Sequence, residues 1–329
     1  MTGDLSDKIF AIKDEEEFLE TALSVFLWQS ENSLLYGRYL SALGRPGGKP
    51  RRIEEIPFLP VTFFRTHRVV TGNIEPSVVF ESSGTAATIP GKHYVSDISL
   101  YERSFVNCFR HFYGDPSDYF IAAILPSYSE RGNSSLVYMM NGLIKRSSKE
   151  GSGFYNNNFP ALVRKAEAAA KRREKILVLG VSFALLDLAG RNSPDLGGAI
   201  VMETGGMKGR RKEITREELH AVLKERLNVD TVHSEYGMTE LLSQAYSSGD
   251  GKFRCPPWMK VMIRDPHDPL EILSTPGRTG GISIVDLANI NSCSFIATGD
   301  LGRLHNDGSF EVLGRFDDSD VRGCNLMFE

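Results

Sequence analysis

The chain has 329 residues, 41% of them hydrophobic and 24% charged, and a formal net charge of −4 at pH 7. This composition is typical of a globular protein with one large core or two domains, and the nearly balanced charge argues against a nucleic-acid-binding face. No apolar run of about 18 residues predicts a membrane-spanning helix, and residues 1–13 lack the residue order of a signal peptide. The four cysteines form neither a C-x-x-C pair nor a metal-binding cluster, which indicates free thiols in a reducing cytoplasm.

The first third of the chain predicts helices joined by a turn-rich connector. Residues 15–40 place apolar side chains at roughly helical spacing, which predicts one helix that packs on a core. The connector is "GRPGGKPRRIEEIPFLP". Asp97 is a good N-cap for a helix that ends near Phe112, and Cys108 lies on the apolar stripe of this helix. We therefore expect Cys108 in the core.

Three apolar runs in the middle of the chain predict buried strands. They are residues 119–125, 175–181 and 197–203, and helical patterns such as residues 159–175 separate them. This alternation predicts an α/β fold with a mostly parallel sheet covered by helices. Because ligands bind at the carboxyl ends of such strands, the segments of interest are "PSYSERGNSS", "SFALLD", "TGGMKG" and "EYGMTE".

The last quarter predicts short strands and turns, with Asp307-Gly308 at a hairpin turn. We expect a small β subdomain from about Pro256 onward. The domain organisation expected from the sequence is a helical region over residues 1–75, an α/β nucleotide-binding core over 76–255, and the β subdomain with a C-terminal tail over 256–329.

The loop in "FESSGTAATIPGKHYVSD" follows an apolar run and precedes the predicted helix. It is not the nucleotide P-loop, because Gly84 and Gly91 enclose six residues instead of four and His93 stands where Ser or Thr is required. Its hydroxyl groups and glycine still suit an anion, and Lys92 would add positive charge. Two interpretations are open at this point: a phosphate-binding loop and a plain polar turn.

Three motifs together resemble the adenylate-forming superfamily of acyl- and aryl-CoA synthetases, adenylation domains and luciferases. They are Ser-Ser-Gly-Thr, then Tyr-Gly-x-Thr-Glu, then Thr-Gly-Asp-Leu-Gly with a later Gly-Arg-x-Asp. Further segments resemble the LuxE-type acyl-protein synthetases (long-chain-fatty-acid–luciferin-component ligases) over nearly the whole chain: "IPFLPVTFFRTHRV", "LPSYSERGNSSLVYMM", "METGGMKG" and "VRGCNL". The resemblance implies the large N-terminal domain of the adenylate-forming fold plus a small β subdomain.

The resemblance also implies an ATP-dependent enzyme that activates a carboxylic acid, most simply a fatty acid. The carboxylate attacks the α-phosphate of ATP and gives an acyl-adenylate and pyrophosphate, with Mg²⁺ as the cofactor. By this resemblance, the terminal phosphates of ATP would contact Ser82, Ser83, Gly84 and Thr85, and the α-phosphate would contact Thr239. Glu240 would hold Mg²⁺, Asp300 would bind the ribose, and Arg315 would reach the ribose or the phosphates. The residues near the adenine would be Tyr236, Gly205, Gly206 and Gly237.

A plainer interpretation stays open for several of these residues. Glu240 is also a suitable acid for the first turn of a helix, where it favours the helix dipole. Asp300 is also a suitable turn residue, and Tyr236 a core aromatic. Lys208 is either a phosphate ligand or a solvated lysine, and His93 either a substrate contact or an ordinary loop histidine.

Two departures from the superfamily pattern affect the expected catalysis. The usual Thr-Thr-Gly of the phosphate loop is Thr-Ala-Ala here from Thr85 on, which implies a weaker grip on phosphate. The sequence also lacks the mobile C-terminal domain that carries a catalytic lysine, a feature shared with LuxE-type chains. Lys92, Lys208 and Arg315 remain candidates for the cation that replaces this lysine.

In LuxE-type proteins a cysteine near the C-terminus takes the acyl group as a thioester, and the matching residue is Cys324. The nearby Arg322 would favour the thiolate. The implied partner is an acyl-acceptor protein such as an acyl reductase or a carrier, and the plainer alternative is a cysteine in a frayed tail. Cys255 and Cys293 carry no such resemblance and are expected to be structural.

The sequence therefore predicts a cytoplasmic AMP-forming acyl-protein synthetase. Two rival functions stay open: an acyl- or aryl-CoA ligase of the phenylacetate-CoA ligase type, and a nucleotide-binding protein without catalysis.

Overall fold

The computed structural model describes residues 2–45, 48–73, 75–82, 89–126, 132–156, 158–190, 194–205 and 214–316. These residues form two units. Unit 1 contains the described residues up to Tyr101, the segment Glu240–Ser243, and the described residues from Arg254 onward. Unit 2 contains Glu102–Thr239 and Gln244–Phe253, again within the described ranges.

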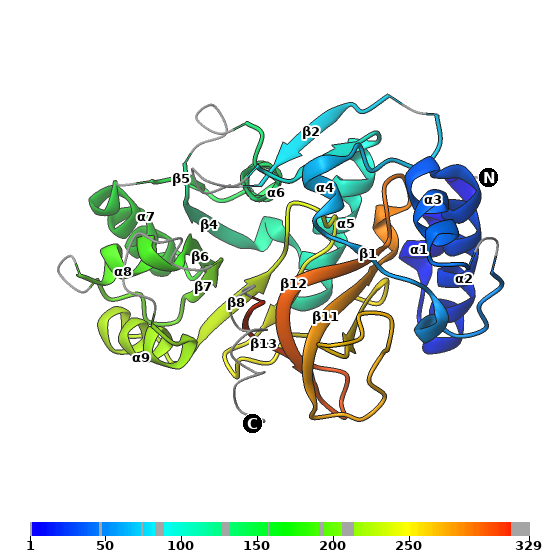
Figure 1. Ribbon diagram of the computed structural model, residues 1–329. Helices are drawn as coiled ribbons and strands as arrows, with labels where there is room; N and C mark the ends of the chain where they lie inside the picture. Colours follow the sequence, from blue (N-terminus) through cyan, green and yellow to red (C-terminus); the bar gives the residue numbers. More distant parts are fainter. Residues whose placement is uncertain are drawn as a thin grey trace, which may run out of the picture. The chain divides into compact units, whose positions relative to one another are not determined.

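Unit 1 begins with the helices α1 (Thr2–Ala11), α2 (Glu15–Asn32) and α3 (Leu34–Ala42), drawn in blue in Figure 1. The single helix predicted over residues 15–40 is wrong, because the chain breaks at Ser33. Ser33 has an extended backbone, ends α2, and caps α3 by accepting a hydrogen bond from the Tyr36 amide. The predicted packing holds for Phe18 and Phe26, which are buried, whereas Leu34 beyond the break is 72% exposed.

A β-hairpin follows the short helix α4 (Phe63–Thr66). It consists of β2 (Val78–Glu81) and β3 (Lys92–Val95), which pair antiparallel. One step past this pairing, the Ser82 amide donates to the Gly91 carbonyl over 2.9 Å, and the Gly91 amide donates to Ser82 Oγ over 2.7 Å. These bonds close the base of the loop of residues 83–88, which lies outside the described residues.

The helix predicted after Asp97 is confirmed as α5 (Ile98–Tyr113), along which the chain passes from unit 1 to unit 2. Asp97 Oδ1 accepts a hydrogen bond from the Ser99 amide, as expected of an N-cap. Cys108 is completely buried, as predicted.

The predicted strands at the end of the chain form an antiparallel sheet in unit 1. The strands are β10 (Met259–Arg264), β11 (Thr279–Asp286), β12 (Phe295–Leu304) and β13 (Phe310–Arg315). The predicted Asp307-Gly308 turn joins β12 to β13, with Gly308 at a φ of 77°. No pattern in the sequence predicted β1 (Leu59–Pro60), which pairs parallel with β12 and adds an early segment to this sheet.

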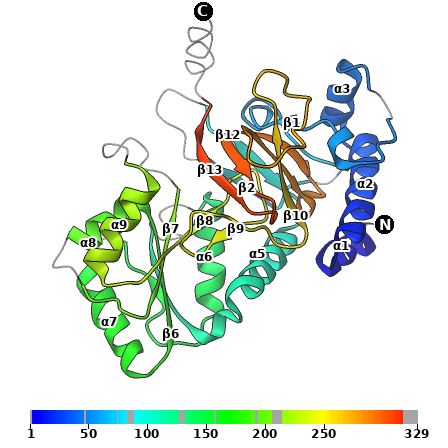
Figure 2. The same cartoon turned by 90° about the horizontal axis from the view of Figure 1, so that it is seen from below.

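Unit 2 is built on a second sheet, whose strand order is β5-β4-β6-β7-β8-β9. All neighbouring strands are parallel except the pair β8 and β9, so the predicted mostly parallel sheet is confirmed. The strands are β4 (Tyr119–Ile124), β5 (Gly153–Phe154), β6 (Lys175–Val181), β7 (Ile200–Thr204), β8 (Val232–Tyr236) and β9 (Ala245–Ser247). Its helices are α6 (Ser135–Arg146), α7 (Phe159–Lys171), α8 (Ser182–Gly190) and α9 (Arg216–Leu227). Figure 2 shows α7, α8 and α9 on one face of this sheet and α6 on the other.

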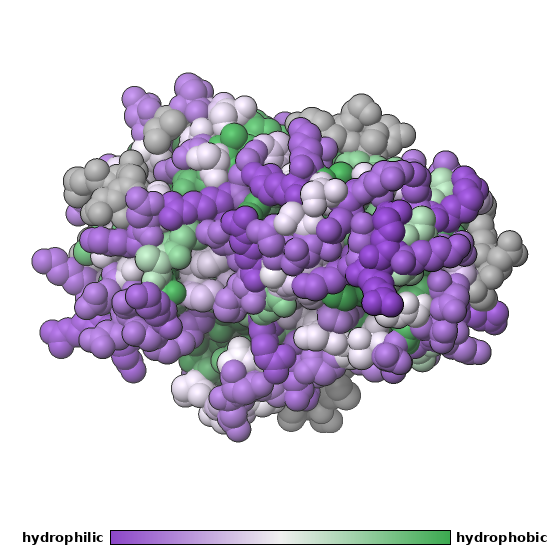
Figure 3. Space-filling view, turned by 180° about the vertical axis from the view of Figure 1, so that it is seen from behind, coloured by the Kyte–Doolittle hydropathy of each residue, from purple (hydrophilic) through white to green (hydrophobic). Residues whose placement is uncertain are grey.

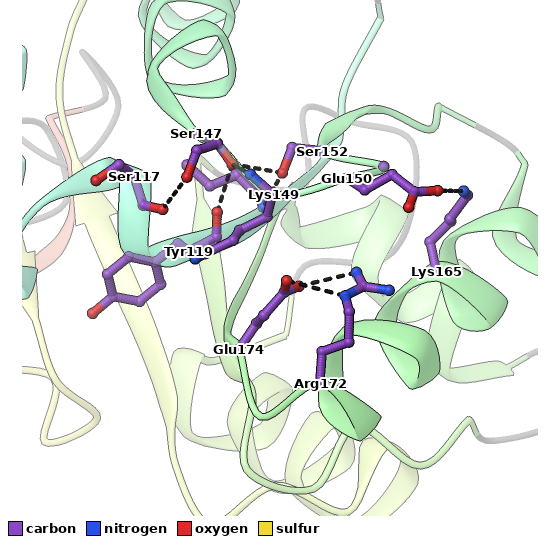
Figure 4. Close-up of polar contacts among 12 residues, drawn as sticks. Ser117, Tyr119, Ser147, Lys149, Glu150, Ser152, Lys165, Arg172 and Glu174 are labelled. Atoms are coloured by element: carbon purple, nitrogen blue, oxygen red, sulfur yellow. Dashed lines mark hydrogen bonds and ion pairs between the residues drawn. The ribbon is translucent and has the colours of Figure 1, made fainter.

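Serine side chains complete the outer edge of β4, where β5 is too short to pair with its first residues (Figure 4). Ser147 Oγ donates to the Tyr119 carbonyl over 2.6 Å, and the Ile121 amide donates to Ser152 Oγ over 3.0 Å. The two hydroxyl groups are themselves 2.8 Å apart. This cluster lies where β4 begins, so it stabilises the sheet at the end opposite to where ligands of parallel sheets bind.

Polar residues cover most of the surface seen in Figure 3, and apolar residues appear in small scattered patches. Among the described residues, the exposed large hydrophobic ones are Leu27, Leu34, Ile89, Val222 and Leu313. None of the helices in the described ranges has the length and apolar character needed to cross a membrane.

Candidate active site

Within unit 1 the carboxylate of Glu240 lies against the base of the β2–β3 loop. A Cβ atom on Gly91 would overlap with Glu240 Oε1 and would lie 3.4 Å from Ser82 Oγ. The structure thus brings together Ser82 and Glu240, two predicted site residues that are far apart in the sequence. Glycine at position 91 is what allows this approach, because any larger residue would occupy the space of the carboxylate.

The Glu240 side chain is an acid in a desolvated position with cations nearby. Only 7% of the residue is exposed, and burial raises the pKa of Glu240 above its usual value. The hydrogen bond from its own main-chain amide and the positive charges of Arg315 and Arg65 lower this pKa, and the negative charge of Asp300 raises it further. A buried acid whose pKa is shifted by specific charged neighbours is typical of functional sites.

Asp300 and Arg315 face each other across the β12–β13 pair. Their main chains are in register, and Arg315 Nε donates to Asp300 Oδ1 over 3.2 Å. Asp300 is 8% exposed, whereas the Arg315 side chain is 72% exposed. The plainer alternative for Asp300, a turn residue, is wrong, because the residue lies inside β12 at an irregularity of the sheet.

The donor set around Glu240 fits Mg²⁺ that arrives with a nucleotide. Mg²⁺ is usually held by one or two carboxylates together with substrate phosphates, and it rarely occupies a cage made only of protein ligands. Within the described ranges, no three His, Cys, Asp or Glu side chains gather into a metal-binding group. Glu240 supplies one buried carboxylate beside a hydroxyl, which matches the first arrangement.

Two of the candidate cations belong to unit 1 and have acidic partners. Lys92 Nζ lies 3.4 Å from Glu81 Oε1, and both side chains are partly exposed. Arg315 pairs with Asp300 as described above. The Lys92–Glu81 pair is partly exposed on both sides and contributes little to stability, so Lys92 is available to a ligand at small cost. The Arg315–Asp300 pair joins an exposed guanidinium to a buried carboxylate.

The carboxyl ends of β6, β7 and β8 carry the polar residues of unit 2. Ser182 directly follows β6 and donates from its Oγ to the Gly205 carbonyl over 2.7 Å. Gly205 has a φ of 67°, a left-handed conformation that glycine adopts without strain. The hydroxyl group therefore holds the main chain at Gly205, the first of the two glycines predicted near the adenine.

Two buried acids lie on adjacent strands just before these ends. Thr204 Oγ1 donates to Glu235 Oε2, and Glu203 forms an ion pair with Arg216 over 3.3 Å. Burial opposes ionisation of Glu203, but His220, Arg216 and Ser234 outweigh it, so its pKa lies below the usual value. Burial raises the pKa of Glu235 to about 7, and the charge of Glu203 contributes to that increase.

The Tyr-Gly-x-Thr motif leaves the sheet at the end of β8. Tyr236 is half-buried and packs edge-on against Phe253, with ring centroids 5.9 Å apart. A Cβ atom on Gly237 would come within 2.5 Å of Glu235 Oε1, so this glycine also makes room for a carboxylate. Thr239 is partly exposed.

The remaining predictions divide between residues with other contacts and residues outside the described ranges. His93 is a core residue, because only 1% of it is exposed and its Nε2 lies 2.9 Å from Ser292 Oγ. Six predicted site residues lie outside the described residues: Ser83, Gly84, Thr85, Gly206, Lys208 and Cys324.

Several polar residues around these positions were missed by the sequence analysis. Glu203 and Asp286 had a usable signal, since each is an acid in a segment that is otherwise typical of a buried strand. Glu235 and Arg264 had none. Asp286 accepts hydrogen bonds from the amides of Leu242 and Ser243, which lie two and three residues after Glu240.

Comparison of the sequence with protein-family models finds no match, and comparison with curated proteins finds none either. Solved structures do resemble the chain. They include 2-hydroxyisobutyryl-CoA ligase in the postadenylation state, with a TM-score of 0.64, 14% identity, and coverage of 92% of this chain and 68% of that one. ATP-bound MatB from Rhodopseudomonas palustris has a TM-score of 0.53 and 17% identity over 72% of this chain. A long-chain-fatty-acid-CoA ligase from Archaeoglobus fulgidus has a TM-score of 0.53 and 15% identity over 75% of this chain.

These likenesses define the fold. The chain has the mixed α/β fold of the N-terminal domain of adenylate-forming ligases, as the sequence motifs implied. It spans 47% of the length of the MatB chain and 53% of that of the Archaeoglobus ligase.

Proposed function

We propose that the protein activates a carboxylic acid with ATP to form an acyl-adenylate. The observation that carries this proposal is the placement of Glu240 against Ser82 and Gly91, with the charges of Asp300 and Arg315 close enough to affect its ionisation. Three segments that the superfamily uses for nucleotide binding thus meet within one unit. The similar structures include one with bound ATP and one in a postadenylation state, which supports the same chemistry.

In the first step a carboxylate oxygen of the acid attacks the α-phosphorus of ATP. The bond from that phosphorus to the bridging oxygen breaks, and pyrophosphate leaves with its electron pair. Catalysis of such a transfer depends on positioning and on neutralising phosphate charge. Mg²⁺ held by Glu240 would supply part of that neutralisation. Ser82, Ser83, Gly84 and Thr85 would hold the terminal phosphates, and Lys92, Lys208 or Arg315 would add positive charge.

The other nucleotide contacts follow the motifs. Asp300 would accept hydrogen bonds from the ribose hydroxyl groups, which a carboxylate does well. Tyr236 with Gly205, Gly206 and Gly237 would lie near the adenine, and Thr239 would bond the α-phosphate. We assign these roles by motif, and the positions of Tyr236 and Gly205 at the carboxyl ends of parallel strands support them.

The second step would transfer the acyl group to Cys324. The thiolate attacks the acyl carbonyl carbon, a thioester forms, and AMP leaves. The three other cysteines are poor nucleophiles: burial raises the pKa of Cys255 and of Cys293 to about 12, and Cys108 Sγ donates to the Gln244 carbonyl inside the core. From Cys324 the group would pass to an acceptor protein, such as a reductase or a carrier, in the reducing cytoplasm.

A second candidate acceptor is coenzyme A, because two of the similar structures are CoA ligases by name. The first step is the same in both cases. The acceptor therefore has to be separated from adenylation by experiment, as does a protein that binds ATP without catalysis.

Intact-mass spectrometry tests these alternatives together. The protein is incubated with ATP, Mg²⁺ and a mixture of fatty and aromatic acids, alongside Cys324→Ala and the control Cys255→Ala. We expect a hydroxylamine-labile adduct in the wild type and in Cys255→Ala, and none in Cys324→Ala. An adduct that persists in Cys324→Ala contradicts the thioester assignment. If coenzyme A is added and acyl-CoA forms in place of a protein adduct, the result favours the CoA ligase. ATP binding without pyrophosphate exchange contradicts the proposal that the protein is an enzyme.

A further inference from the structure

The Thr298–Asp300 segment of β12 is a bulge in the antiparallel sheet of unit 1. The register places Ser283 opposite Ala297 and Gly281 opposite Leu301, so Ile282 alone faces three residues of β12. A bulge of this kind interrupts the ladder of main-chain hydrogen bonds and redirects a side chain, and bulges are common beside active sites. Asp300 is the last of these three residues, and its carboxylate accepts a hydrogen bond from Arg315 on β13.

Arg264, the last residue of β10, supplies donors to the carbonyl groups that the interrupted ladder leaves. Its Nη1 donates to the Ile282 carbonyl over 2.5 Å, and its Nη2 donates to the Thr298 carbonyl over 2.6 Å. A single guanidinium therefore joins β11 to the first residue of the bulge. Arg264 is 9% exposed, and charge-assisted bonds that are shielded from water are the strong class of hydrogen bond.

The surroundings of the guanidinium are built to hold it in this place. Arg264 is in register with Gly281, and a Cβ atom on Gly281 would lie 2.5 Å from Arg264 Cζ. The aromatic ring of Phe316 lies on the guanidinium, with its centroid 5.4 Å from Cζ. The Phe316 amide donates to the Gly299 carbonyl over 2.8 Å, so the same residue also contacts the middle of the bulge.

The bulge is closed from within by Thr298. Its Oγ1 donates to the Ile282 carbonyl over 2.9 Å and accepts from the Asp300 amide over 3.1 Å. The Ile282 carbonyl thus has two donors, Arg264 and Thr298. Asp300 is linked to Arg264 through Thr298 alone on one route and through Thr298 and Ile282 on the other. A change in the guanidinium would therefore reach the Asp300 main chain through Thr298.

We propose that Arg264 is a positioning residue that holds the Thr298–Asp300 bulge and thereby aims the Asp300 carboxylate at the ribose of the nucleotide. This inference rests on the proposed function, since the ribose contact belongs to it. Lysine in place of Arg264 keeps the charge but cannot bridge two carbonyl groups with a planar fork.

The first test is hydrogen exchange, which needs no nucleotide. Exchange of the Asp300 and Phe316 amides is compared in the wild type, Arg264→Lys and the control Arg278→Lys, whose side chain is exposed. We expect exchange at both amides to rise about tenfold or more in Arg264→Lys and to stay unchanged in the control, while peptides from β6 and β7 keep their protection. Unchanged exchange in folded Arg264→Lys overturns the proposal.

If Arg264→Lys does not fold, Gly281→Ala provides the same test, because its methyl group displaces the guanidinium while the arginine remains. Faster exchange at Asp300 in this variant supports the proposal, and unchanged exchange overturns it.

The second test separates positioning from stability by measuring affinity for ATP and for its 2′-deoxy and 3′-deoxy analogues. We expect the wild type to prefer ATP by about tenfold or more, since bonds to a charged group are worth that much. Asp300→Ala and Arg264→Lys should both reduce the preference to about twofold. If Arg264 has a purely structural role, Arg264→Lys should lower the affinity for all three nucleotides by the same factor. That result would overturn the inference. If Asp300→Ala keeps the preference, the proposed ribose contact itself fails.

Discussion

The carboxylate of Glu240 occupies the space that a side chain on Gly91 would need. Gly91 also exchanges two hydrogen bonds with Ser82, one through its amide and one through its carbonyl. One glycine therefore closes the β2–β3 loop and admits the acid from a distant part of the chain.

The first prediction concerns Gly91→Ala. The added methyl group should displace Glu240 and reduce ATP–pyrophosphate exchange at least tenfold, with a loss of stability of about 1–3 kcal/mol from overpacking. Gly153→Ala is the matched control, because nothing lies within 4 Å of its added Cβ atom. Exchange rates and thermal denaturation of both variants check this. Equal activity in the two variants would contradict a functional role for this contact.

The second prediction is that Glu240→Gln is more stable but less active. Because burial raises the pKa of Glu240, ionisation costs folding free energy at neutral pH, and the neutral amide avoids that cost. We expect a stability gain on the order of 1 kcal/mol at pH 7 and a loss of Mg²⁺-dependent exchange of about 100-fold. Urea denaturation and a Mg²⁺ titration measure the two effects. A variant with normal Mg²⁺ dependence would remove Glu240 from the proposed metal site.

The third prediction concerns Asp286, which anchors the segment after Glu240. Its two oxygens accept from the amides of Leu242, Ser243 and Ala288 and from Ser243 Oγ. All four partners are donors, so the amide group of Asp286→Asn would face donors in either orientation. We expect a loss of about 2–4 kcal/mol.

Asp268→Asn is the control for this change, because Asp268 is exposed and its side chain accepts one hydrogen bond, from the Leu270 amide. It should change stability by less than about 0.5 kcal/mol. Chemical denaturation followed by circular dichroism measures both variants. Similar losses of stability in Asp286→Asn and Asp268→Asn would show that the hydrogen bonds around Asp286 contribute no more to stability than those of an exposed aspartate.

The fourth prediction is a pH dependence of stability caused by Glu235. Its pKa is raised to about 7 in the folded protein, from a usual value of 4.5, so the folded state binds the proton more tightly. The resulting stabilisation is complete below pH 4.5 and is lost as the pH rises to about 7. Relative to Glu235→Gln, the wild type should therefore lose up to about 3 kcal/mol over this range. Parallel curves of stability against pH for the two proteins would contradict this.

Strands β4, β6 and β7 of unit 2 could be predicted because they are buried over nearly their whole length and therefore read as continuous apolar runs. The run over residues 175–181 matches β6 at both ends. The Asp307-Gly308 turn was equally predictable, since the residue types themselves favour the required backbone conformation. In both cases the signal is local.

The errors arose where tertiary contacts decide the structure. The apolar spacing of residues 15–40 continues through Ser33, so nothing in the pattern marks the break that the serine cap creates. The two-residue strand β1 is too short to carry a pattern, and only its partner β12 defines it. Resemblance identified Glu240 and Asp300 as candidates, but Arg264 and Asp286 act through main-chain groups distant in sequence and leave no motif.

Unit 1 is assembled from parts of the chain that the ribosome produces far apart in time. Gln29 is completely buried, and its side-chain amide bonds the Asn289 and Ile290 carbonyls, which lie 260 and 261 residues away. At about 5–20 residues per second, these partners emerge roughly 10–50 s after Gln29. Unit 2 draws only on residues 102–253, all of which are synthesised before Asn289. The apolar faces of the N-terminal helices therefore stay without their partners until the last strands of unit 1 have been synthesised. Unit 1 thus depends on completion of the chain for its folding.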